Sequence, residues 1–256
     1  MLDDRLVPQL NFISRAILAD EETRQMTDYA ISEKLVAAAI ADRGKAHPWD
    51  RFPVAKTALV VIDMQNYFVA PDSQGGPNPA QGIVPSINRL AAAMRELGGN
   101  VIWIQNTTTN TRQAWSVRHE LLSHTKAEFR LAAMEIGAEG YQLWPTLDVR
   151  PDDTMLVKKF YSAFAQGSSD LVATLRTKGI EFVLITGTYT NVCCQASAQD
   201  AMMLNFRTIM VSDCNAGSTP ETHAAALDNF FEFFGDVLSV DEVLERLEAP
   251  TQTAAA

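Results

Sequence analysis

Short apolar strands alternate with helical stretches along most of the chain, and no other sequence feature restricts the possible folds as strongly. Apolar runs, several rich in β-branched residues, occupy residues 57–63, 101–105, 155–157, 182–186, 208–212 and 237–240. Helical patterns are found between them at 83–97, 170–177, 192–204 and 224–234. Apolar strands separated by helices predict a parallel sheet that is buried on both faces. Right-handed crossovers then make the predicted α/β fold doubly wound.

Three parts of the chain lie outside this alternation. Residues 1–54 carry apolar side chains at helical spacing and predict an N-terminal helical arm, which either packs on the main domain or on a partner subunit, or covers a neighbouring active site as a lid. The main domain is predicted to span residues 55–248, and residues 249–256 are predicted to be a disordered tail. Residues 107–150 are mixed in composition and predict an insertion beside the ligand pocket.

Charge and apolar length exclude several classes of partner. The chain has 31 acidic and 21 basic residues, a formal charge of −10, which argues against nucleic acid or an anionic membrane as partner. No apolar stretch approaches the roughly eighteen residues of a membrane-spanning helix. The N-terminus lacks the basic start of a signal peptide, and the three cysteines form no disulfide framework. We therefore expect a cytoplasmic protein.

Reactive side chains stand at three predicted strand ends. Asp63 ends the first strand, Lys158 follows the third, and Cys193 lies just beyond the fourth, where a helix begins. Ligands of open parallel sheets bind at the carboxyl ends of the strands, so these positions favour a site. A helix N-terminus and a nearby lysine would both stabilise a Cys193 thiolate, and free N–H groups there could hold an oxyanion.

Each of these residues also has a purely structural interpretation. Asp63 could cap a turn or helix, Lys158 could be a solvated surface ammonium, and Cys193 could fill the core. Cys194 and Cys214 are interpreted as core residues. Three reactive residue types at three ends of one sheet nevertheless favour a catalytic interpretation.

Three sequence blocks resemble the signature blocks of the isochorismatase-like cysteine hydrolases. They are ALVVIDMQNYF (58–68), VKKFYSAF (157–164) and ITGTYTNVCCQASAQDA (185–201), and the resemblance extends over about residues 55–245. It implies a six-stranded parallel sheet with helices on both faces and a catalytic triad of Asp63, Lys158 and Cys193. It also implies a cis peptide bond near Thr188–Tyr189.

The resemblance is nearest to the ureidoacrylate and N-carbamoyl amidohydrolases of that family. It implies that Asn106 and Tyr161 face a small-molecule substrate and that Tyr189 and Gln65 bind it as well, with Gln65 also helping to orient Asp63. The backbone N–H groups of Tyr189 and Cys193 would form the oxyanion hole. The implied reaction is metal-independent cleavage of a C–N bond in a small amide, carbamoyl or ureido compound through a thioester on Cys193.

No metal or other cofactor is expected. Nicotinamidase-like members of the fold carry an Asp-x-His motif after the second strand, where this chain reads QNTTTN (105–110). The four histidines are not at metal-ligand spacing and are interpreted as surface or packing residues: His47, His119, His124 and His223. No cluster of arginines in the sequence indicates a binding site for a dicarboxylate.

Two other functions remain open, and the nucleophile has an alternative. The chain could hydrolyse isochorismate or another vinyl ether, with Asp63 as acid and no covalent intermediate. It could also be a non-catalytic binding or assembly module that kept the fold. In some isochorismatases a cysteine falls one place later, where Cys194 stands. We expect a homo-oligomer, a dimer or a tetramer, with the N-terminal arm as a candidate contact surface.

Overall fold

The computed structural model describes residues 20–71 and 78–249, and a six-stranded, all-parallel sheet forms its centre. The strands lie in the order β4-β3-β2-β5-β6-β7. Their bounds are β2 (Thr57–Ile62), β3 (Asn100–Asn106), β4 (Thr154–Lys158), β5 (Phe182–Thr188), β6 (Arg207–Ala216) and β7 (Asp236–Leu238). The predicted α/β class and the predicted six-stranded parallel sheet are confirmed.

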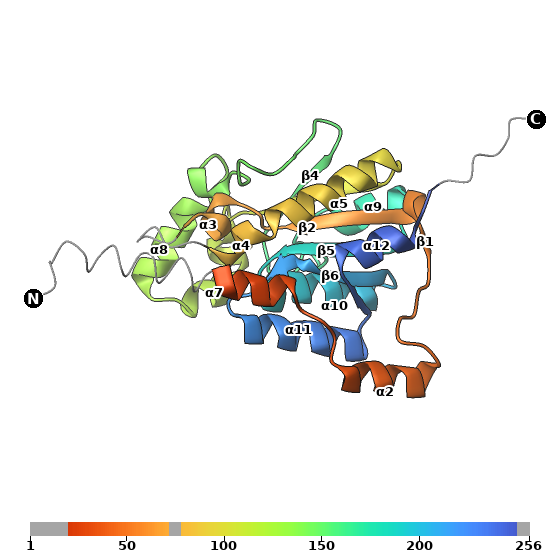
Figure 1. Cartoon of the computed structure of the whole chain (residues 1–256). Coiled ribbons are helices and arrows are strands. Elements are labelled where there is room, and N and C mark those ends of the chain that lie inside the picture. The colour runs from red at the N-terminus through yellow and green to blue at the C-terminus, as the bar shows by residue number, and fades with distance from the viewer. Residues whose placement is uncertain (1–19, 72–77, 250–256) are drawn as a thin grey trace, which may run out of the picture.

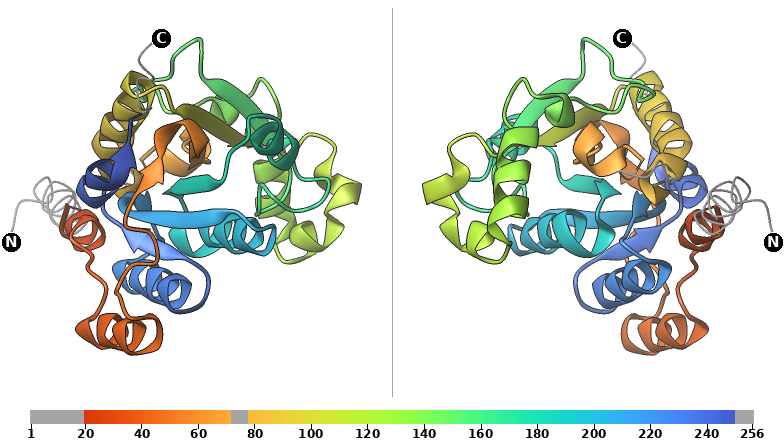
Figure 2. Two further views of the ribbon diagram at one scale, coloured as in Figure 1. Left: turned by 90° about the vertical axis from the view of Figure 1, so that its right-hand side faces the viewer. Right: turned by 90° about the vertical axis from the view of Figure 1, so that its left-hand side faces the viewer.

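Helices cover both faces of this sheet (Figures 1 and 2). One face packs on α5 (Val84–Glu96) and α12 (Val240–Arg246), and the other on α9 (Leu171–Thr177), α10 (Gln195–Met203) and α11 (Pro220–Phe233). Along β2, Leu59 and Val61 join the first core, whereas Val60 and Ile62 join the second. A strand buried on both sides needs apolar residues at every position, which explains the unbroken apolar runs in the sequence.

The strand order reverses between β2 and β5, and the two backbones approach closely at their carboxyl ends. Ile62 pairs with Gly187 there, and a Cβ on Gly187 would lie 2.0 Å from the carbonyl oxygen of Ile62. Gly187 also has a φ of +113°, so glycine is required for both reasons. The Thr188–Tyr189 peptide bond that follows is cis, as the sequence resemblance predicted. Reversal points of this kind are where open sheets bind ligands.

The insertion at 107–150 folds over the carboxyl ends of β3 and β4. It contains α6 (Thr111–Ala114), α7 (Ser116–Glu120), α8 (His124–Ala133) and the short helix η2 (Glu139–Tyr141). The Thr107 amide donates to the carbonyl of Lys158 (2.9 Å), and the Thr108 amide donates to the carbonyl of Met134 (3.1 Å). Figure 1 shows α8 beside α3 (Asn66–Val69), at the same end of the molecule.

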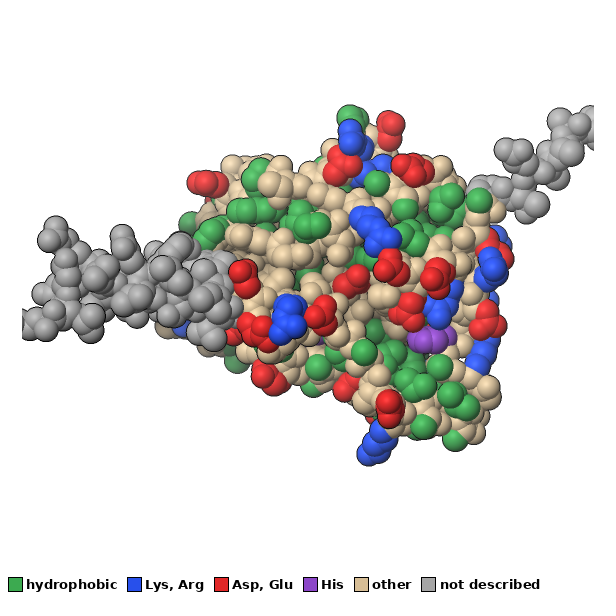
Figure 3. Space-filling model, viewed as in Figure 1, with side chains coloured by type: hydrophobic (Ala, Val, Ile, Leu, Met, Phe, Trp, Pro, Cys, Tyr) green, Lys and Arg blue, Asp and Glu red, His purple; other side chains and the backbone are tan. Residues whose placement is uncertain are grey.

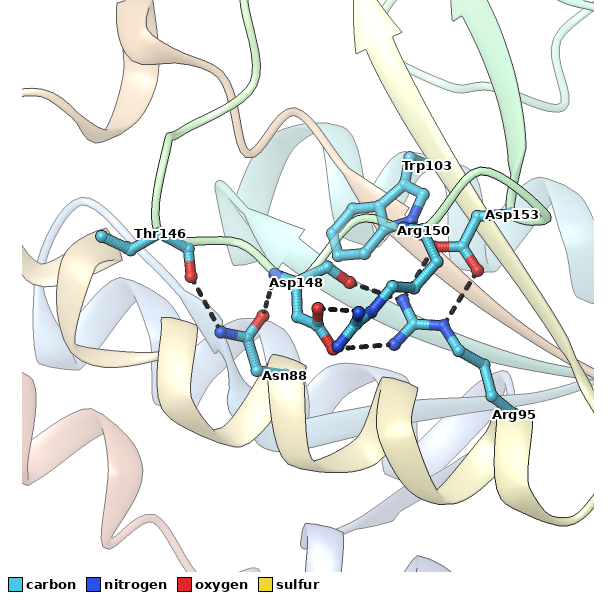
Figure 4. A network of polar contacts seen from close by, with 7 residues as sticks. All are labelled: Asn88, Arg95, Trp103, Thr146, Asp148, Arg150 and Asp153. Carbon is cyan, nitrogen blue, oxygen red and sulfur yellow. Dashed lines mark hydrogen bonds and ion pairs between the residues drawn. The ribbon is translucent and has the colours of Figure 1, made fainter.

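A polar network fixes the chain that leads from the insertion into β4 (Figure 4). The Arg95 guanidinium of α5 donates to the Asp153 carboxylate at 3.0 and 2.7 Å, and the Trp103 indole of β3 donates to the same carboxylate at 2.8 Å. The Asn88 side chain donates to the Thr146 carbonyl. Because Asp153 directly precedes β4, these contacts set the position of the strand that carries Lys158 at its end.

The described part of the N-terminal arm packs on the domain that follows it. Residues 20–27 are helical, and α2 (Glu33–Arg43) contacts α11. Met26 is buried in the first core, and the Tyr29 hydroxyl donates to Asp228 of α11 at 2.5 Å. Strand β1 (Phe52–Pro53) pairs in parallel with β8 (Leu247–Glu248). The apolar positions expected in residues 1–19 and the tail from residue 250 onward lie outside the described residues.

The surface mixes charges of both signs. On the face drawn in Figure 3, basic side chains lie beside acidic ones. Many form exposed ion pairs, as Lys56 does with Glu181 (2.6 Å) and Arg89 with Asp241 (2.6 Å). Within residues 20–71 and 78–249, no helix combines the length and the apolar character that crossing a membrane requires.

Candidate active site

The side chains of Asp63, Lys158 and Cys193 meet at the carboxyl edge of the sheet. The Lys158 Nζ lies 2.8 Å from the Asp63 Oδ2, and both side chains are fully buried. The Lys158 ammonium also donates to the carbonyl of Phe160 at 3.0 Å. Cys193 is 5% exposed, and its thiol interacts with both the Asp63 carboxylate and the Lys158 ammonium. Residues that are 35 to 130 positions apart in the chain thus share one enclosed space.

Local backbone structure places each of the three groups. Asp63 follows β2 with a φ of +56°, and its amide donates to the carbonyl of Ile104 at 3.0 Å. Cys193 lies in η3 (Thr190–Cys194), a single π-helical turn between β5 and α10. The amides of Val192 and Cys194 both donate to the Tyr189 carbonyl (3.0 and 3.2 Å) and are therefore engaged. The predicted oxyanion donors, the amides of Tyr189 and Cys193, stay the candidate pair.

Burial is the largest single influence on the pKa values of Asp63, Lys158 and Cys193. It raises the pKa of Cys193 to about 12, with the Asp63 carboxylate adding to the rise and Lys158 opposing it. It also raises the pKa of Asp63, although Lys158 and Cys193 counteract part of that effect. For Lys158 burial acts downward, but Asp63 and Cys193 outweigh it and raise its pKa. Burial therefore opposes the thiolate that the helix N-terminus and the lysine are expected to stabilise at Cys193.

Asn106 and Tyr161 lie near the triad but are held by protein groups. The side-chain amide of Asn106 donates to the carbonyl of Phe160 at 3.4 Å. Lys158 donates to the same carbonyl. The Tyr161 ring stacks edge-on against Trp115 with 4.8 Å between centroids, and the Arg118 guanidinium lies 5.6 Å from its centre. Their role as substrate contacts stays a prediction.

The Gln65 side chain has a different function from the predicted one. Its Nε2 donates to the backbone carbonyls of Asn106 (3.0 Å) and Tyr141 (2.8 Å). Its Oε1 accepts from the backbone N–H of Asn106 (2.7 Å). All of these partners are backbone groups, and Asp63 is not among them. Gln65 therefore holds the end of β3 beside the end of β2, and the predicted orientation of Asp63 by its side chain is corrected.

Two cavities adjoin this region. One of about 930 Å³ is bordered by the side chains of Tyr189, Tyr67 and Phe129, together with the chain at Gly217 and Ser218. A second cavity of about 320 Å³ is lined by Tyr67, Arg118, Leu122, Thr125, Lys126, Phe129 and Arg130. Tyr67 and Phe129 line both. Asp63, Lys158 and Cys193 line neither cavity, and all three are buried.

Arg118 and Arg130 were not predicted as site residues. They stand twelve positions apart in the insertion, on α7 and α8, and only the fold of that insertion brings them to one cavity. Arg130 is 6% exposed, and its Nη2 donates to the Asn106 Oδ1 at 3.1 Å. The two arginines form no cluster in the sequence, because twelve positions separate them. The only sequence signal was an arginine among apolar residues of a helix.

The histidines contribute no recognisable metal site. His223 is fully buried and contacts the Thr190 hydroxyl at 2.8 Å, and His47 pairs with the buried Asp236 at 2.8 Å. Across residues 20–71 and 78–249, no group of three or more His, Cys, Asp or Glu side chains could hold a metal ion. His223 instead secures η3, the turn that carries Cys193, against α11.

Acidification should destabilise the protein through His223. Burial lowers the pKa of His223 to about 4, so between pH 6.5 and 4 the unfolded chain binds a proton that the folded chain does not. Its contribution is complete above about pH 6.5 and is lost as the pH falls, which predicts a decrease of about 2 kcal/mol in unfolding free energy from pH 7 to 5. Urea unfolding at both pH values would measure this. The variant His223→Gln should lose that part of the pH dependence. The control variant His124→Gln, which changes an exposed histidine, should keep it. An unchanged pH dependence of the unfolding free energy in His223→Gln would contradict the assignment.

Comparisons with known proteins agree with this fold. The isochorismatase domain matches residues 57–242. A ureidoacrylate amidohydrolase RutB from Serratia proteamaculans is 32% identical over 222 residues, which cover 79% of this chain and 88% of that protein. The corresponding RutB of Stutzerimonas stutzeri is 30% identical over 220 residues, which cover 79% and 87%. A cysteine hydrolase structure from Pseudomonas syringae pv. phaseolicola superposes with a TM-score of 0.69 at 25% identity, covering 78% of this chain and 96% of that one.

Proposed function

Because the chain belongs to the isochorismatase family, we propose that it is an amidohydrolase that uses Cys193 as its nucleophile. The resemblance seen in the sequence blocks is confirmed by the family match over residues 57–242. Curated relatives that share 30–32% of their residues with this chain are amidohydrolases, so the chain is a hydrolase that acts on C–N bonds. The residues and steps that follow are our proposal for how it does so.

One observation carries the proposal: a buried carboxylate, an ammonium and a thiol form a single contact group. The ion pair between Asp63 and Lys158 is 2.8 Å long and fully buried, beside Cys193. A buried ion pair contributes little net stability, because desolvation cancels most of its Coulomb energy. Its cost is understandable if the carboxylate must be held ionised next to a thiol that is to be deprotonated.

The first half-reaction follows from this arrangement. The Cys193 Sγ attacks the substrate carbonyl carbon while its proton passes to the Asp63 carboxylate. The resulting oxyanion accepts hydrogen bonds from the amides of Tyr189 and Cys193, a contribution of about 3 kcal/mol per donor in comparable sites. Asp63 then returns the proton to the leaving nitrogen as the C–N bond breaks. Lys158 keeps Asp63 anionic before the attack, and stabilises the sulfur as it becomes negative.

The second half-reaction releases the acyl group. Water gives a proton to Asp63 and attacks the thioester carbonyl, and the C–S bond breaks as Cys193 regains a proton. A ureido substrate would leave a carbamoyl group on sulfur, and its hydrolysis gives carbamate, which decomposes to ammonia and carbon dioxide. We propose a ureido or carbamoyl compound as substrate, because the curated relatives are ureidoacrylate amidohydrolases.

An ammonia-release assay over small amides, carbamoyl amines and ureido acids tests this function. We expect turnover of at least one ureido or carbamoyl compound, and intact-protein mass spectrometry during turnover should show a carbamoyl adduct on the peptide that contains Cys193. Cleavage of a vinyl ether with no adduct would overturn the proposal in favour of the non-covalent reaction. No turnover and no adduct with any compound would favour a binding module.

A further inference from the structure

Three cations surround the smaller cavity, and no acid accompanies them. Arg118, Lys126 and Arg130 line this space of about 320 Å³, together with apolar and aromatic side chains and Thr125. This grouping is unusual for a chain with ten more acidic than basic residues, in which most described basic side chains have an acidic partner nearby. A pocket with positive charge and no internal counterion favours an anionic ligand.

Arg130 is the decisive residue of this cavity. It is only 6% exposed, and among the described residues it forms no ion pair. Its guanidinium donates one hydrogen bond to a polar protein group, from Nη2 to the Asn106 Oδ1. Its guanidinium lies 5.5 Å from the Tyr67 ring centre and 6.0 Å from the Phe68 ring centre. Burying a guanidinium without an acid partner is costly, unless a ligand supplies that partner.

Arg118 repeats the pattern in the same cavity. Its Nε is buried without a hydrogen-bond partner, and the Tyr161 ring supports its guanidinium plane. Two guanidinium groups on aromatic supports, with donors still unused, match the geometry by which arginine binds a carboxylate through two parallel hydrogen bonds. The ammonium of the exposed Lys126 adds charge at the rim.

The cavity connects to the triad through two shared groups. Arg130 contacts the Asn106 side chain, and the Asn106 amide donates to the Phe160 carbonyl that also accepts from Lys158. Asn106 is also the register partner of Lys158 in the sheet. The positive charge of Arg130 also acts to lower the pKa of Asp63, although burial raises that pKa overall.

We infer that Arg130, together with Arg118 of the same cavity, binds the carboxylate of the substrate, so that the enzyme is specific for ureido or carbamoyl acids over their neutral counterparts. This inference rests on the proposed function, since it names the end of the substrate that does not react. The carboxylate fills the cationic cavity, and the ureido carbonyl extends past Asn106 toward Cys193. The insertion at 107–150 thereby supplies substrate selection, and the sheet supplies the reacting groups.

The test compares 3-ureidopropanoate with its methyl ester, which removes the negative charge and leaves the ureido group intact. The native enzyme should prefer the acid. In Arg130→Gln the kcat/KM for the acid should fall about 100-fold, mainly through KM, because a buried charged hydrogen-bonding partner is lost. The ester should change by less than about 3-fold, since it makes no such ion pair. Arg118→Gln should show a weaker loss of the same kind.

Three controls separate the possible outcomes. Arg112→Gln, which removes an exposed arginine paired with Glu128 on the same insertion, should alter neither substrate. Arg130→Lys keeps the charge in case the glutamine variant folds poorly, and should retain a preference for the acid. Calorimetry of 3-ureidopropanoate with the Cys193→Ala protein, with and without Arg130→Gln, measures binding without turnover. Equal losses for acid and ester, or equal binding by both proteins, would overturn the inference and leave the proposed function standing. Failure of all turnover, with binding that still depends on Arg130, would contradict the proposed function alone.

Discussion

Replacing Cys193 with Ala is expected to reduce turnover by a factor of about 10⁴ or more, as the loss of a covalent nucleophile does in other hydrolases. The alanine variant keeps the buried ion pair of Asp63 and Lys158 but has no atom that can form the acyl intermediate. Stability should change little, because one small buried atom is removed from a site that remains packed. Steady-state ammonia release and mass spectrometry of the intermediate would both register the loss.

The matched controls are the other two cysteines. Cys194 is fully buried, and its thiol donates to the Thr186 carbonyl at 3.8 Å; Cys214 is fully buried in the first core. Cys194→Ala and Cys214→Ala should therefore retain turnover within about 10-fold, with the cost limited to core packing. Full activity in Cys193→Ala together with loss in Cys194→Ala would show that the later cysteine is the nucleophile.

The high pKa of Cys193 changes what chemical labelling can show. With a pKa of about 12, the thiol should react slowly with iodoacetamide at pH 7 and progressively faster as the pH rises. Slow labelling of the free enzyme at neutral pH thus does not argue against catalysis. In the proposed mechanism the thiol loses its proton to Asp63 only as the Cys193 sulfur attacks the substrate carbonyl.

The sequence predicted the sheet and the three central residues because both depend on local patterns. Buried parallel strands require continuous apolar runs, and the residues that follow them lie at one edge of the sheet whatever the helices do. Asp63, Lys158 and Cys193 could therefore be placed from strand ends and from the three family blocks. The glycine at 187 is explained only by the fold, through its close approach to Ile62.

The insertion could not be predicted in the same way. Its helices are short and their apolar residues are partly exposed, as Phe129 (67% exposed) and Leu121 (76% exposed) are, so no clear periodicity marks them. The meeting of Arg118 and Arg130 at one cavity depends on how the short helices α7 and α8 fold together, which is a tertiary property. For Gln65, the sequence could not show which groups its side chain would contact. Its hydrogen-bonding partners are backbone groups at the end of β3 and in η2, and these come close to Gln65 only in the folded chain.

Asp63→Asn should abolish catalysis and also destabilise the fold, and the two effects can be separated. An asparagine cannot accept the thiol proton, so turnover should fall by about 10³-fold or more. It also leaves the fully buried Lys158 ammonium without its counterion, which should cost about 3–5 kcal/mol of unfolding free energy. Urea unfolding and ammonia release from the same preparations would measure both.

The double variant Asp63→Asn with Lys158→Met decides why the buried pair exists. Methionine replaces the lysine stem without its charge, so most of the stability lost in the single variant should return, as it does when buried ion pairs are replaced by neutral groups of similar volume. Catalysis should stay as low as in Asp63→Asn, because the proton acceptor is still missing. A double variant as unstable as Asp63→Asn would mean that the ion pair is needed to build the sheet edge. Restored stability without restored turnover would mean that the chain retains two buried charges for their effect on Cys193, since an uncharged pair would hold the fold equally well.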